Sequence, residues 1–322
     1  MGIEILTHDE LPSRFEPQVH AMSSAALWGY ADFKILAKSR KVGIKWAPYL
    51  SVYAVEGERV LSRVGVRRFP MTTKNGGEQV AGITMVATRP DRERKGMARM
   101  LLEDVHRRER ADGIRFSTLW TNKSWYAHTL YEKLGYFDVY EWHRAMRRIP
   151  KNVPALPRGW KLRPATRRDG IAMCGLHDRA NRGRPGFAPR QRGFWSKRFA
   201  WGRNDPKEFR ILTRGGRAVG YAELTGPPGR RASGELVAPE AEAMETLLLG
   251  LEGEAADGWL MLIGGSVNER GDALAGKGYD VLPGAWFPLM AADLEGKMGR
   301  DELVRHLGAD DPRFACQNSD WF

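Results

Sequence analysis

The sequence has only two cysteines, no long apolar run and no low-complexity segment. Cys174 and Cys316 are far apart and have no histidines at ligand spacing, so neither a disulfide framework nor a metal site is predicted. No apolar stretch approaches the roughly 18 residues that a membrane span needs. The first residues also lack the cationic and apolar regions of a signal peptide. We therefore expect a cytoplasmic protein with no membrane partner.

Basic residues are what the chain has in excess. Its 322 residues are 42% hydrophobic, enough for a substantial core and two domains, and the formal net charge is +12. This charge favours an acidic partner, such as nucleic acid, a membrane surface or a phosphorylated ligand, but does not choose among them. Because no recognition-module signature such as an RNP motif accompanies the charge, nucleic acid is not the expected partner.

The segment IPKNVPALPRG, with three prolines, indicates a linker between two domains. We expect a first domain over residues 1–149, a linker over 150–158, a second domain over 159–291 and a C-terminal tail over 292–322. The two domains are called the first and second units below. In the first unit, RVLSRVGVRRFPMTT and EQVAGITMVATRP predict two long antiparallel strands joined by a turn at KNGG.

The second unit partly repeats the first. Both have the order strand, proline, helix, strand, helix, and both then close with a Gly-Tyr pair. This shared order indicates an old duplication. The residues that could bind a ligand or take part in catalysis are not repeated, because in the sequence Glu245 corresponds to Gly96 and Leu274 corresponds to Tyr131.

Gly96 lies where a strand passes through a charged loop into a helix. The first N–H groups of a helix have no intrahelical partner, and with the helix dipole they bind phosphate groups. Glycine lets such a ligand approach without meeting a Cβ atom. The same pattern is typical of an ordinary loop before a solvated basic helix face, on which His106 is expected to lie, and this stretch alone does not decide between the two.

Two motifs together resemble the GCN5-related N-acetyltransferase (GNAT) superfamily. VATRPDRERKGMARMLLEDV is similar to its pyrophosphate-binding motif, with Gly96 and Ala98 in place and Glu93 where a basic residue usually stands. SWYAHTLYEKLGY is similar to its later motif, with Ser124 at the usual Asn position. The strand VAGITMVATRP also resembles the enhanced intracellular survival branch of tandem acetyltransferases.

The resemblance implies an α/β (α+β) fold with two tandem GNAT-like domains. Each would be a mixed, mostly antiparallel twisted sheet flanked by helices, and the second would be degenerate because it lacks the phosphate-loop residues. Acetyl-CoA would therefore bind the first unit alone. The residues implied in binding it belong to the strand end, the loop and the two helix starts: Met85, Val86, Thr88, Arg94, Lys95, Gly96, Met97, Ala98, Arg99, Ser124 and Ala127.

The resemblance also implies direct acetyl transfer to a primary amine of a small molecule or peptide. Tyr131 would donate a proton to the leaving thiolate, although an ordinary packing role on its helix is the alternative. His128 on the same helix is expected to pack or to lie at the surface. An oligomer is compatible with the sequence. Four early residues either line the acceptor site or belong to the core: Trp28, Tyr30, Asp32 and Phe33.

Two other functions stay open on the sequence. Glu93 and Ser124 depart from the family motifs, which is compatible with a non-enzymatic module of the same fold that senses acetyl-CoA or does not bind it. The net charge and the 11 tryptophans are compatible with an RNA-directed protein, whose affinity would fall steeply with added salt.

The base that takes a proton from the amine is not evident, because no acid lies between Glu78 and Asp91. Water can relay the proton, or, as the resemblance implies, the carboxylate of Phe322 docks near Tyr131. Alternatively, Trp321 and Phe322 only pin the tail to an apolar groove. We expect residues appended after Phe322 to abolish turnover and to spare acetyl-CoA binding. Steady-state assays with parallel titration calorimetry test this, and unchanged turnover would overturn it.

Overall fold

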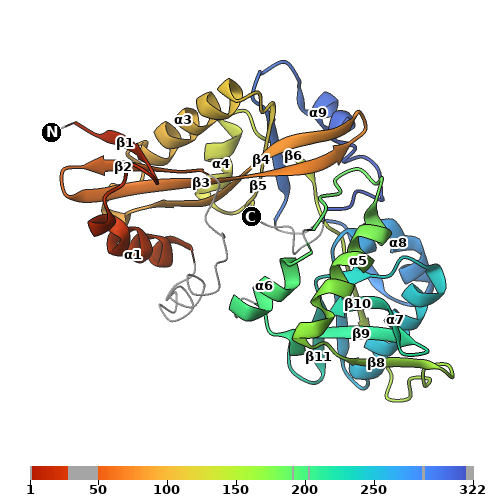
Figure 1. Cartoon of the computed structure of the whole chain (residues 1–322). Coiled ribbons are helices and arrows are strands. Elements are labelled where there is room, and N and C mark those ends of the chain that lie inside the picture. Colours follow the sequence, from red (N-terminus) through yellow and green to blue (C-terminus); the bar gives the residue numbers. More distant parts are fainter. Residues whose placement is uncertain (1, 28–49, 191, 202–203, 285–286, 317–322) are drawn as a thin grey trace.

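The computed structural model of the chain describes residues 2–27, 50–190, 192–201, 204–284 and 287–316 (Figure 1). Its largest sheet has seven strands, in the order β1 (Glu4–Thr7), β2 (Leu50–Glu56), β3 (Arg59–Thr73), β4 (Gly76–Thr88), β5 (Phe116–Trp120), β15 (Leu289–Asp293) and β6 (Phe137–Tyr140). A four-stranded sheet follows the order β12 (Leu236–Val237), β10 (Arg217–Glu223), β9 (Phe209–Arg214) and β8 (Trp160–Pro164). Another follows the order β11 (Arg230–Ser233), β13 (Trp259–Ile263), β7 (Arg144–Arg148) and β14 (Asp280–Leu282).

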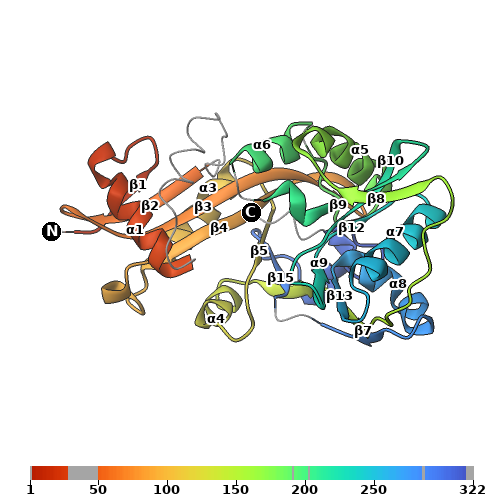
Figure 2. The same ribbon diagram turned by 90° about the horizontal axis from the view of Figure 1, so that it is seen from below.

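Helices cover both faces of the seven-stranded sheet (Figures 1 and 2). One face packs against α3 (Met97–Ala111) and α4 (Tyr126–Glu132), and the other against α1 (Glu16–Leu27). The tail contributes α9 (Arg300–Leu307) beside the β3–β4 hairpin. The second unit contains α5 (Gly170–Asn181), α6 (Phe194–Trp201), α7 (Ala241–Glu254) and α8 (Gly265–Gly276). Short 3-10 helices lie at Ser13–Phe15, Pro90–Arg92, Arg167–Asp169 and Pro206–Glu208.

The long hairpin predicted from the sequence is confirmed. β3 and β4 pair antiparallel from Ser62 opposite Thr88 to Thr73 opposite Gly76. At the turn, the Thr73 hydroxyl oxygen lies 3.0 Å from the Gly76 carbonyl oxygen, and Gly76 has a φ of 115°, which glycine adopts without strain.

The two units exchange one strand each. β15 comes from the end of the second unit, yet it pairs antiparallel with β5 and β6 in the first unit's sheet, where its blue colour stands among yellow strands (Figure 1). β7 comes from the end of the first unit, yet it pairs with β13 and β14. Both exchanged strands carry fully buried side chains, including Met290 and Ala145. The units are therefore joined through both of their cores.

The expected fold class is confirmed, because mixed and mostly antiparallel sheets are flanked by helices. The division of the chain at residues 149 and 291 stays a proposal. β7 precedes residue 149 but pairs with strands of the second unit, and β15 spans residue 291 but pairs with strands of the first unit. The repeated order of elements is also visible, since β12, α7, β13 and α8 follow one another as β4, α3, β5 and α4 do. Within the described ranges we find no helix with the length and apolar character needed to cross a membrane.

Candidate active site

β4 separates from β5 after three paired positions, and the interval between the two strands beyond them is called the slot below. The two strands pair in parallel only from Val80 opposite Phe116 to Gly82 opposite Thr118, and β4 then continues alone on that side to Thr88. A bulge accompanies the separation, because Met85 has a φ of 55° and the pairing with β3 shifts beside it. Backbone groups along this edge of β4 therefore have no strand partner in the part of the chain that is described. An extended, amide-containing ligand can pair there as an added strand.

The residues expected along this strand end lie at the slot. Met85 and Val86 form the bulge and are half-buried, and Val86 packs against the core under α3. The Thr88 hydroxyl is 2.9 Å from that of Ser62, which also donates to the Ala87 carbonyl at 3.0 Å. The Thr88 side chain is therefore held by β3, and only its backbone is directed to a ligand in the slot.

The slot leads to the start of α3, where two residues have a left-handed backbone conformation. Arg94 has a φ of 58° and Gly96 a φ of 79°. Gly96 is the N-cap, no side chain caps the helix, and its first turn has no acidic residue. A Cβ atom on Gly96 would meet nothing within 4 Å, so the backbone conformation, rather than crowding, accounts for glycine. The N–H groups of a 15-residue helix thus face an open, uncapped end, which favours an anion.

The side chains around this loop are not equivalent. Arg94 is exposed and lies 5.8 Å from the ring centre of Tyr126, which is 65% exposed. Lys95 is exposed and donates to the Asp91 carbonyl at 3.2 Å. These two cations lie beside the helix start. Tyr126 was not singled out from the sequence, although an aromatic residue at the exposed start of α4 was a usable signal.

Two other cations of the loop are engaged elsewhere. Arg92 pairs with Glu56 of β2 at 2.8 Å, and Arg99 pairs with Glu103 one turn further along α3, also at 2.8 Å. Met97 and Ala98 are half-buried in the first turn, so they contribute backbone N–H groups rather than polar side chains.

Tyr131 lies on α4 with its ring buried against the core. The residue is 6% exposed, and its ring packs edge-on against Tyr136 at 5.8 Å between centroids. No residue of the described chain hydrogen-bonds its hydroxyl, and the hydroxyl is not among the fully buried polar atoms. Burial raises the pKa of Tyr131 above its ordinary value. The side chain is therefore a protonated phenol with a free O–H at neutral pH.

Ser124 lies just before α4 and does not cap it. The helix begins at Tyr126, its N-cap is Trp125, and no side chain makes a cap hydrogen bond. Ser124 is exposed, and both its N–H and its hydroxyl donate to the Asn122 side chain, at 2.8 and 2.7 Å. Asn122 therefore organises this turn. Ala127 is half-buried and packs against the core that contains Tyr131.

His106 is buried, so the expectation of a solvated histidine was wrong. Its Nε2 atom lies 2.8 Å from the Tyr136 hydroxyl, which lies 2.6 Å from the Ser117 hydroxyl, and Ser117 donates to the Ala81 carbonyl at 3.1 Å. Because Ser117 gives its proton to that carbonyl, it accepts from Tyr136, which in turn accepts from a neutral histidine. Burial, followed by the charge of Arg110, lowers the pKa of His106 to about 4.

His128 is half-buried and lies beside a carboxylate, in agreement with a packing role. Its Nε2 atom is 2.8 Å from Asp138 of β6, and its Nδ1 atom is 3.7 Å from Glu132. Both partners hold the ring in place at the side of α4.

Five expected site residues, Trp28, Tyr30, Asp32, Phe33 and Phe322, lie outside the described residues, so their roles stay predictions. The described tail ends near the slot: the Cys316 carbonyl accepts from the Trp142 indole at 3.0 Å. Trp142 stacks on Trp120, the last residue of β5, at 4.2 Å between ring centres. In the described ranges, no cluster of histidine, cysteine or acidic side chains could hold a metal ion.

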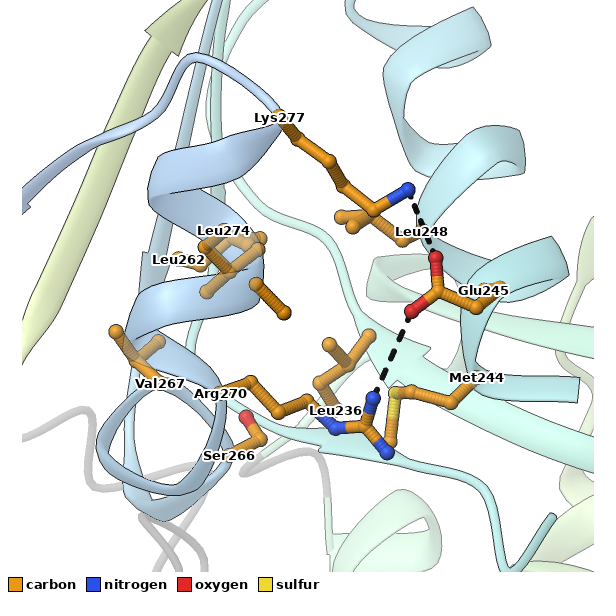
Figure 3. Close-up of a pocket in the computed structure, with 11 residues that line it drawn as sticks. Leu236, Met244, Glu245, Leu248, Leu262, Ser266, Val267, Arg270, Leu274 and Lys277 are labelled. Carbon is orange, nitrogen blue, oxygen red and sulfur yellow. Dashed lines mark ion pairs between the residues drawn. The ribbon is translucent and has the colours of Figure 1, made fainter. Parts of the chain in front are cut away.

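Glu245 does not occupy the structural place of Gly96, as the sequence comparison of the two units suggested. Gly96 is the N-cap of α3, whereas Glu245 lies one turn inside α7, whose N-cap is Glu240. Glu245 forms ion pairs with Lys277 at 2.8 Å and Arg270 at 3.6 Å across a cavity between α7 and α8 (Figure 3). Leu274, which corresponds to Tyr131, is 4% exposed and lines the same cavity. The second unit thus has an acid, Glu242, in the first turn of α7, and a leucine in place of Tyr131.

Comparisons with known proteins agree with this geometry. Residues 44–138 match a family model described as an acetyltransferase (GNAT) domain. No curated protein matches the chain. Among solved structures, a probable N-acyltransferase from Enterococcus faecalis V583 has a TM-score of 0.71 at 14% identity, over 92% of this chain and 74% of that one. A GCN5-related N-acetyltransferase from Kribbella flavida has a TM-score of 0.65 at 17% identity, over 91% and 72%.

Residues 44–138 are thus similar to the GNAT acetyltransferase domain, and the chain as a whole shares the fold of these solved structures. It also resembles Eis1 from Mycobacterium abscessus, with a TM-score of 0.61 at 15% identity over 91% of this chain and 74% of that one. At such identities the structural likeness establishes the shared fold.

The lowered pKa of His106 gives a testable pH dependence. An unfolded chain binds a proton at His106 below about pH 6.5, whereas the folded chain does so only near pH 4, so folding stability falls as pH falls between these values. We expect this histidine to account for a loss of about 3 kcal/mol in the free energy of unfolding over that range. Urea unfolding at several pH values measures it.

A His106→Gln variant should show a flatter pH profile than the wild type between pH 6.5 and 4. His8→Gln is the matched control, because the His8 side chain is 40% exposed and should leave the profile unchanged. Equal slopes for the wild type and His106→Gln would contradict a buried neutral histidine.

Proposed function

We propose that the protein is an acetyl-CoA-dependent N-acetyltransferase whose first unit is catalytic and whose acceptor is a primary amine of a small molecule or peptide. The observation that carries the proposal is the alignment of three features along one path. The unpaired edge of β4 leads to the uncapped start of α3, and the free hydroxyl of Tyr131 lies on the neighbouring helix α4.

The residues present fit acetyl-CoA. The edge of β4 around Met85 would pair with the amides of the pantetheine arm. The backbone N–H groups of Met97 and Ala98, with Arg94 and Lys95 beside them, would hold the pyrophosphate. When bound, acetyl-CoA supplies the acetyl thioester and a thiol leaving group.

Tyr131 can donate its O–H to a departing thiolate because the phenol is protonated at neutral pH. Burial raises its pKa, which makes the phenol a weaker acid, so its first contribution would be a hydrogen bond that stabilises the thiolate. Its hydroxyl has no competing partner within the described ranges. The core and Tyr136 hold its ring in place, so the Oη atom is already positioned before a ligand binds.

The proton acceptor for the amine is not on β4. Glu78, the acid on that strand, accepts from Thr73 at 2.9 Å and lies 2.6 Å from His306, at the hairpin end of the sheet. A water relay or the chain end near Phe322 are the routes we retain. The described tail supports the second route, because its last contact is with Trp142 beside the end of β5.

Acetyl-CoA binding should depend on Gly96. We expect Gly96→Glu to weaken binding by at least about 100-fold, because a carboxylate would sit at the helix start in place of the ligand's phosphates. Titration calorimetry measures the affinity. Gly113→Glu is a matched control, since Gly113 follows the other end of α3, has the same φ of 79° and also has open space around a Cβ atom. Equal weakening by both variants would contradict the proposed site.

Turnover should depend on the Tyr131 hydroxyl. We expect Tyr131→Phe to lower kcat by about 100-fold or more while the affinity for acetyl-CoA stays unchanged, because only the transferable proton is removed. Release of the CoA thiol with a panel of primary amines measures kcat. Tyr140→Phe is the control, since the Tyr140 hydroxyl is buried without a partner in the described chain. Wild-type kcat in Tyr131→Phe would exclude the role, and binding without turnover in the wild type would favour a non-enzymatic module.

A further inference from the structure

A second cavity lies in the second unit, where α5, β12, the start of α8 and the tail meet. Its open volume is about 480 Å³, counting the solvent at its mouth. Its polar lining consists of Asn181, Arg184, Ser266, Glu269, Arg270 and Arg313. Each of the three arginines has an acidic partner, but Arg270 is held loosely, at 3.6 Å from Glu245, so it has capacity for a further anion.

The start of α8 opens into this cavity. The helix has 12 residues, its N-cap is Gly264, no side chain caps it, and its first turn has no acidic residue. Gly265 and Ser266, the first two helical residues, line the cavity. Unpaired N–H groups and the positive end of the helix dipole therefore face the same space as the arginines.

Two side chains of α8 add hydrogen-bond donors that the described chain does not use. Ser266 is buried, with 8% of its surface exposed, and its hydroxyl has no partner among the described residues. Arg270 follows one turn later on the same face of the helix. It reaches Glu245 only at 3.6 Å, makes no hydrogen bond within the described ranges, and has a buried Nε atom without a partner. Figure 3 shows Ser266 and Arg270 rising from the same helix.

The other charged groups of the cavity are already matched. Arg184 pairs with Glu269 at 2.8 Å, and Arg313 pairs with Asp311 at 2.8 Å. Buried donors without acceptors are costly, so the unused groups of Ser266 and Arg270 call for an acceptor that the described residues do not supply.

We propose that this cavity binds a small oxyanion, namely the phosphate or carboxylate group of a small molecule. The N–H groups at the start of α8, the Ser266 hydroxyl and the Arg270 guanidinium hold it. The site adjoins the cavity around Glu245 and Lys277, because Ser266 and Arg270 line both cavities. It does not depend on the activity proposed for the first unit.

The test uses the full chain with Gly96→Glu as background, so that the loop of the first unit does not bind the probe. Inorganic phosphate is titrated and followed by calorimetry and by ³¹P line width, and acetate is titrated in parallel to tell phosphate from carboxylate preference. We expect one site, weakened about 10-fold or more by Arg270→Gln and several-fold by Ser266→Ala. Circular dichroism confirms that the variants are folded. Unchanged affinity in both variants overturns the proposal.

A gain of affinity gives an independent check. Glu245→Gln removes the carboxylate that competes for Arg270, so phosphate should bind several-fold more tightly. Glu242→Gln is the matched control, because Glu242 lies on the same helix α7 but pairs with Arg214 at the surface. Equal effects of the two variants would mean that phosphate affinity depends only on the net charge of the protein, which would overturn the proposed site.

Discussion

The exchange of β15 and β7 is the constraint on which the rest of the structure depends. β5 pairs with β15 along its whole length, from Phe116 to Trp120, but with β4 over only three residue pairs. β5 therefore keeps its place in the sheet while β4 is free to diverge, and the divergence creates the slot. Since β15 comes from the end of the second unit, the second unit must be folded and attached for β5 to have its partner strand on the side away from β4.

The starts of the equivalent helices α3 and α7 differ in charge between the two units. At the start of α3 no acid lies in the first turn, and Arg94 and Lys95 remain at the surface, so an anion must come from outside. At the start of α7 the chain supplies its own acid, Glu242, in the first turn, and Arg214 pairs with it at 2.8 Å. The two helix starts of this repeated architecture therefore differ in charge.

The sequence was sufficient to predict features that depend on local chemistry. The β3–β4 hairpin follows from alternation around an Asn-Gly turn, and the family motifs identified the helix start at Gly96. The strand exchange was not predictable, because nothing local tells β15 from a neighbour of its own unit. The burial of His106 had a signal that was missed: Leu102, Val105, His106 and Glu109 recur at helical spacing, although arginines surround them in sequence.

The choice between two buried tyrosines shows which property identifies a proton donor. Burial raises the pKa of both Tyr131 and Tyr136, so a raised pKa does not separate them. Their hydroxyl partners do. Tyr136 sits between His106 and Ser117, and its proton is committed to a chain of hydrogen bonds that ends on the Ala81 carbonyl. Tyr131 packs against the Tyr136 ring and has no such partner among the described residues, so of these two protons its proton is the one available to a ligand that enters between β4 and β5.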